Sequence, residues 1–123
     1  MDDRQAAIYL GRVRVAKGIL LMIFPRAALR PALGSGLESP AAGVTARGVG
    51  ASEVILGVGV SISAGERVGS ANWMSMCAAS DAIGAAALLF TPGLPRRARL
   101  FGLMSVVSAV LHFRAARGLS LGS

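Results

Sequence analysis

Aromatic residues, cysteine and charge are all scarce in this chain of 123 residues. Charged residues make up 15% of it, against about 25% in a typical soluble domain. Four Phe, one Tyr and one Trp are few aromatic side chains for a water-soluble core. The single cysteine, Cys77, excludes an internal disulfide, and the chain has no Cys/His metal-binding pattern. We therefore expect neither a metal nor another cofactor.

Hydrophobic and small residues dominate the rest of the composition. The chain is 54% hydrophobic, contains 16 Gly, and has a mean hydropathy of +0.62. Small residues let helix backbones approach closely in lipid, where packing drives helix association. The composition predicts an all-α integral membrane protein that crosses the membrane several times. Its Arg-, Ala-, Gly- and Val-rich character is typical of GC-rich bacterial genomes, so we expect the bacterial cytoplasmic (inner) membrane.

The charge balance is basic, with 13 Lys and Arg against 6 Asp and Glu. A nucleic-acid-binding face needs its basic residues clustered on a solvated surface. Here most of them flank or interrupt apolar runs, so nucleic acid is not an expected partner. Contact with anionic lipid headgroups is the better explanation, above all through the group Arg96, Arg97 and Arg99.

A membrane-spanning helix needs about 20 residues. Gly and Pro breaks divide the chain into four candidate spans and one short interfacial helix over residues 26–33. We predict one domain over residues 1–123, a four-helix membrane bundle with short loops, whose spans cover about residues 5–24, 41–64, 68–90 and 99–116.

The first segment and the orientation leave alternatives open. The first segment carries three basic residues, so an amphipathic helix at the interface is a second interpretation. A signal peptide is disfavoured, because the apolar run 18–24 is short and ends at Pro25. Basic residues are nearly balanced between the two sides of the membrane. The group Arg96, Arg97 and Arg99 favours termini on the outside, whereas the cations of the first segment favour termini on the inside, the interpretation that we prefer.

Arg14, Glu53 and Asp81 each lie near the middle of a candidate span. Each shares a helix face with small residues, because the steps between them are three and four residues. We therefore predict that the three meet in a polar cluster, with Arg47 as a fourth member and Arg12 and Lys17 as secondary candidates. Ser105 and Ser108 could add hydrogen-bond donors. The helix-packing positions on these faces are Gly11, Gly18, Gly50, Gly57, Ser61 and Gly84.

The cluster has two interpretations. Ionisable residues inside a membrane are functional-site candidates by default, so it could bind a ligand, proton or ion. Opposite charges that meet can also satisfy each other and fix the register of the helices, and we favour this interpretation. His112, the single histidine, is expected to be an interfacial side chain and not a haem ligand. The serines lack a histidine base, so no catalytic residues are expected.

Several motifs resemble a known group of proteins. A Gly-Arg pair precedes Arg14, Pro25 ends the first span, the run 46–53 reads ARGVGASE, and Asp81 lies in the third span. The chain resembles a group of small four-helix bacterial membrane proteins, common in actinobacteria, whose domain has no assigned function. It is more distantly similar to DoxX-like membrane proteins, which share an Arg–Gly–Glu pattern. Those are linked to quinone or thiol redox chemistry, but no redox centre is evident here.

The sequence therefore predicts a small, non-enzymatic membrane protein that acts as an oligomeric or accessory subunit. Its partners would be copies of itself or other membrane subunits, and the Arg14, Glu53 and Asp81 cluster would be its polar core. The alternative is a small-ligand or lipid-binding protein, transporter-like or redox-linked, that uses the same cluster as its site.

Overall fold

The computed structural model describes residues 2–34 and 37–121. Over these residues it contains five α-helices and no strand, which confirms the prediction of an all-α fold. In chain order the helices are α1 (Asp3–Ile23), α2 (Pro25–Leu33), α3 (Pro40–Ile62), α4 (Arg67–Phe90) and α5 (Arg96–Leu121).

Local chemistry explains where the helices begin. Asp2 caps α1 by accepting a hydrogen bond from the Gln5 amide at 2.7 Å, and the Gln5 side chain accepts from the Asp2 amide in return. Ser39 caps α3 by accepting a hydrogen bond at Oγ from the Ala42 amide at 3.2 Å, and it is followed by Pro40, whose fixed φ suits the first helical position. The turn between α3 and α4 contains Gly65 at φ +98°, a conformation that L side chains rarely adopt.

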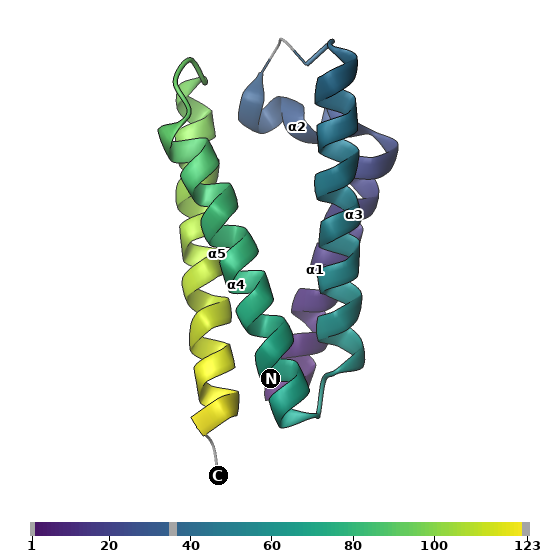
Figure 1. The fold of residues 1–123 in the computed structure, drawn as a ribbon, viewed down its shortest axis with the longest axis vertical. Helices are drawn as coiled ribbons and strands as arrows, with labels where there is room; N and C mark the ends of the chain where they lie inside the picture. Colours follow the sequence, from purple (N-terminus) through teal and green to yellow (C-terminus); the bar gives the residue numbers. More distant parts are fainter. Residues whose placement is uncertain (1, 35–36, 122–123) are drawn as a thin grey trace.

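The long helices form two antiparallel pairs, as Figure 1 shows. Helix α1 packs along α3, and α4 packs along α5, whereas contact between the pairs is limited and runs mainly between α3 and α4. The pairs converge at the end that holds the start of α1 and the end of α5, and they separate towards the other end (Figure 1). There the short helix α2 contacts α1, α3 and α5.

The apolar core lies where the two pairs converge. It is built mainly from small and medium side chains, and its buried members are Ala7, Leu56, Val60, Met74, Cys77 and Ala116. The ring of Trp73 packs against Gly59, whose missing side chain leaves room for it. Trp73 is therefore a partly buried residue that packs against the core.

Two of the helices, α4 and α5, are long and apolar enough to cross a membrane. Only 28% and 17% of their apolar windows are buried, whereas the core helix of a soluble protein would be mostly buried. The finding rests on length and composition, and it supports the predicted set of four spans only in part.

The last helix is longer than expected at both ends. It begins at Arg96 and runs to Leu121, whereas the sequence predicts a span over 99–116 and a polar tail after Gly118. Arginine, alanine and leucine favour helix, so α5 starts at Arg96 and Arg97, directly after Pro95. A single glycine, Gly118, does not end the helix. Residues 35 and 36 of the predicted loop 34–40 lie outside the described residues.

Candidate functional site

Arg14 lies at the centre of a buried cluster of polar side chains. Its Nη1 donates to Glu53 Oε1 at 2.9 Å and to Oε2 at 3.0 Å. Its Nη2 donates to Asp81 Oδ2 and, at 3.4 Å, to the carbonyl oxygen of Cys77. The three charged residues expose only 4%, 6% and 8% of their surface, so these ion pairs are almost fully shielded from the surroundings. Arg14 thereby joins α1 to α3 and to α4.

Glycine positions bring α1 close enough to α3 for the first of these contacts. A Cβ added at Gly57 would lie 2.5 Å from the carbonyl oxygen of Gly11, and one at Gly18 would lie 2.5 Å from that of Gly50. Ser61 also packs against Gly11. Such close backbone contact is what small residues at a three- and four-residue spacing permit.

Helix α5 adds two side chains to the carboxylate of Asp81. Ser108 Oγ donates to Asp81 Oδ2 at 2.7 Å, and His112 Nδ1 lies 3.3 Å from the same oxygen. His112 Nδ1 also lies 2.8 Å from the carbonyl oxygen of Ser108. Because a carbonyl oxygen only accepts, Nδ1 is the protonated ring nitrogen and donates to it. The Asp81 carboxylate is thus held by donors from α1 and α5.

Lys17 completes the cluster from the side of α1. Its Nζ lies 3.1 Å from Glu53 Oε2, and its side chain is 55% exposed. With two basic groups, Arg14 and Lys17, and two carboxylates, the cluster has no net formal charge when His112 is neutral. We call Arg14, Lys17, Glu53, Asp81, Ser108 and His112 the Arg14 cluster.

Two buried nitrogens of the cluster have no hydrogen-bond partner among the described residues: Arg14 Nε and His112 Nε2. Buried polar groups are nearly always paired, so each of these is a position where a further polar partner would be favourable. With Nδ1 protonated, Nε2 of a neutral His112 is an acceptor, whereas Arg14 Nε is a donor.

Three of the residues singled out in the sequence do not join the cluster. Arg47 is exposed and donates from Nε to the carbonyl oxygen of Met22 at 3.2 Å, so it caps the end of α1. It lies six residues before Glu53, or about 9 Å along α3, too far to share the same carboxylates. Arg12 is exposed on the outer face of α1. Gly84 is not a packing position, because an added Cβ there would meet nothing within 4 Å.

His112 is the cluster residue that the sequence interpretation placed wrongly. It was expected at an interface because the last span was expected to end nearby, but α5 continues for nine more residues and His112 is only 3% exposed. The signal that could have located it is its spacing of four from Ser108, which places both side chains on one face of the helix.

Comparisons with known proteins add no relative: no family model matches the chain, and neither the curated proteins nor the solved structures contain a match. What the chain does is therefore inferred from its fold and from the Arg14 cluster.

Proposed function

We propose that the chain is a small integral membrane protein of the bacterial inner membrane. The observation that carries this proposal is the distribution of apolar side chains. Large hydrophobic residues are exposed on all four long helices, among them Ile23, Ile55, Ile83 and Val107, while Arg14, Glu53 and Asp81 are inside. Soluble monomers rarely expose continuous apolar surface beyond a few hundred Å². Four helices of 21 to 26 residues span about 31–39 Å, enough to cross a bilayer.

Within the membrane, we propose a non-enzymatic role as a subunit of a larger assembly, formed with copies of itself or with other membrane proteins. The Arg14 cluster supports this role because its charges are paired with one another and hold the two helix pairs together. The limited contact between the pairs supports it too, since much of the apolar surface of α4 and α5 is not covered by this chain.

The test is extraction followed by a measurement of mass. We expect the full-length chain to stay in the membrane fraction after carbonate washing and to elute in mild detergent at a mass above that of one chain, alone or with a co-purifying membrane protein. Recovery in the aqueous fraction would contradict the membrane placement. A strictly monomeric particle without a co-purifying protein would contradict the subunit role.

A second candidate function is the binding of a small ligand or lipid by the Arg14 cluster itself. The two unpartnered buried nitrogens favour it, because a ligand that pairs with Arg14 Nε or His112 Nε2 would satisfy them. Mass spectrometry of the purified protein distinguishes the two candidates. A bound molecule that is lost in the His112→Leu variant, while the oligomeric mass is kept, would favour this candidate over the subunit role.

A further inference from the structure

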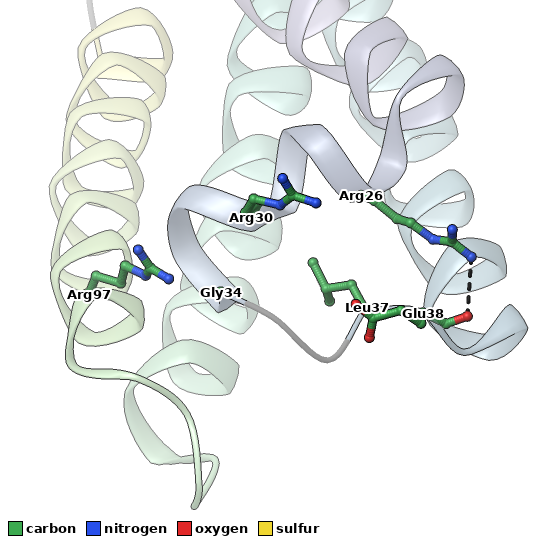
Figure 2. Close-up of a pocket in the computed structure, with 6 residues that line it drawn as sticks. All are labelled: Arg26, Arg30, Gly34, Leu37, Glu38 and Arg97. Atoms are coloured by element: carbon green, nitrogen blue, oxygen red, sulfur yellow. Dashed lines mark hydrogen bonds between the residues drawn. The ribbon is translucent and has the colours of Figure 1, made fainter.

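A hollow of about 320 Å³ lies beside helix α2, which is at the end of the molecule where the helix pairs separate, and no residue of the Arg14 cluster lines it. Its volume is at the lower end of the range of about 300–1,000 Å³ that small-molecule sites occupy. Figure 2 shows that helix α2, the segment before α3 and the first turn of α5 surround it. The six residues that line it are Arg26, Arg30, Gly34, Leu37, Glu38 and Arg97.

Three arginines gather around this hollow. Arg26 and Arg30 are four residues apart on α2 and so share one face, and Arg97 reaches across from α5 towards Gly34 (Figure 2). Like charges at this spacing repel each other. Glu38 supplies the one carboxylate among the six lining residues, which leaves a formal charge of +2. None of the ion pairs found among the described residues includes these arginines.

The backbone positions two of the arginines. Arg26 Nη2 donates to the carbonyl oxygen of Glu38 at 3.1 Å, which ties α2 to the segment before α3. Gly34 ends α2 at φ +72°, and a Cβ there would lie 2.8 Å from Arg97 Nη2. The guanidinium of Arg97 therefore lies against Gly34, in space that a side chain at position 34 would share.

We propose that this hollow binds a phosphate group, either in the headgroup of an anionic lipid or as a soluble anion. Guanidinium groups match phosphate oxygens through paired charge-assisted hydrogen bonds. The lipid source rests on the proposed membrane placement, because α2, Glu38 and Arg97 lie at the ends of the long helices, at headgroup level if those helices span. The soluble source does not depend on it.

The test compares two double variants of the full-length chain in detergent by native mass spectrometry. Arg30→Gln with Arg97→Gln removes two charges from the hollow. Arg12→Gln with Arg114→Gln removes two exposed arginines outside the hollow. We expect retention of phosphatidylglycerol over phosphatidylcholine to fall about tenfold in the first variant and less than about twofold in the second, as for the loss of charge-assisted bonds.

Inorganic phosphate, titrated calorimetrically into the delipidated protein, identifies the source. Binding of phosphate that is lost in the hollow variant, without any lipid preference, assigns the hollow to a soluble anion. Equal retention of phosphatidylglycerol by both double variants, with no phosphate binding, overturns the proposal. If the hollow variant does not fold, the single variants Arg30→Gln and Arg97→Gln replace it, each with an expected fall of about threefold. Carbonate extraction of the same samples tests the membrane placement separately from phosphate binding.

Discussion

At the scale of single residues, Arg14 connects the two helix pairs, because its terminal nitrogens contact carboxylates on different helices. Replacing it with Gln would leave Glu53 and Asp81 buried without their shared cation. We expect the free energy of unfolding to fall by about 3–5 kcal/mol, the usual cost of breaking a buried ion pair from one side. Thermal unfolding in detergent measures the effect.

The control for this substitution is Arg12→Gln, which removes an exposed arginine two residues away on the same helix. Exposed substitutions usually change the free energy of unfolding by no more than about 0.5 kcal/mol. If Arg14→Gln is as heat-stable as Arg12→Gln, Arg14 does not hold the two pairs together.

The members of the cluster differ in how well the sequence predicts them. The sequence predicts Arg14, Glu53 and Asp81, because each is a charged residue in an apolar segment and shares a helix face with small residues. Arg47 has the right chemistry but lies about 9 Å from Glu53 along α3, a separation that their six-residue spacing already implies. His112 was missed because its burial depends on where α5 ends and on which face of α5 meets α4. That face is set by tertiary packing.

At the scale of helices, the contact between α1 and α3 depends on glycine. A Cβ at Gly50 would lie 2.6 Å from the carbonyl oxygen of Gly18, whereas a Cβ at Gly48 would meet nothing within 4 Å. We expect Gly50→Ala to lower the free energy of unfolding by about 1–3 kcal/mol through overpacking. Gly48→Ala should raise it by up to about 1 kcal/mol, because alanine favours helix. Unfolding curves of the two variants that change in the same direction would contradict this account.

The end of α4 depends on an arginine of the next helix. Arg99 donates from Nη1 to the carbonyl oxygen of Leu88 at 2.6 Å and from Nη2 to that of Thr91 at 2.9 Å. The last carbonyl groups of a helix lack partners within the helix, so Arg99 acts as a cap. We expect Arg99→Gln to speed amide hydrogen exchange in the last turn of α4 about tenfold, corresponding to the loss of a charge-assisted bond. Exchange as slow as in an Arg96→Gln control would argue against the cap.

The sequence predicts the helix boundaries better than it predicts how the helices pack. Pro25, Gly34, Gly65 and the break at 91–95 all lie where one helix ends and local backbone chemistry disfavours its continuation. The separation of α1 with α3 from α4 with α5 has no such local signal. It depends on how each pair packs, as in the close glycine contacts between α1 and α3, and that is a property of two helices together.

At the scale of the whole molecule, the proposed membrane placement of the four long helices would put their connections on alternate sides. The structure places the start of α1, the turn at Glu66 and the end of α5 at one end, and Ser39 and Thr91 at the other (Figure 1).

In intact bacteria, Ser39→Cys and Thr91→Cys should both react with a membrane-impermeant maleimide, or both fail to react, and Glu66→Cys should do the opposite. All three positions are exposed, and the native Cys77 is fully buried, so it adds little background. Labelling of Ser39→Cys and Glu66→Cys from the same side would show that α3 does not span. If the termini are inside, as the cations of α1 favour, the reactive pair is Ser39→Cys and Thr91→Cys.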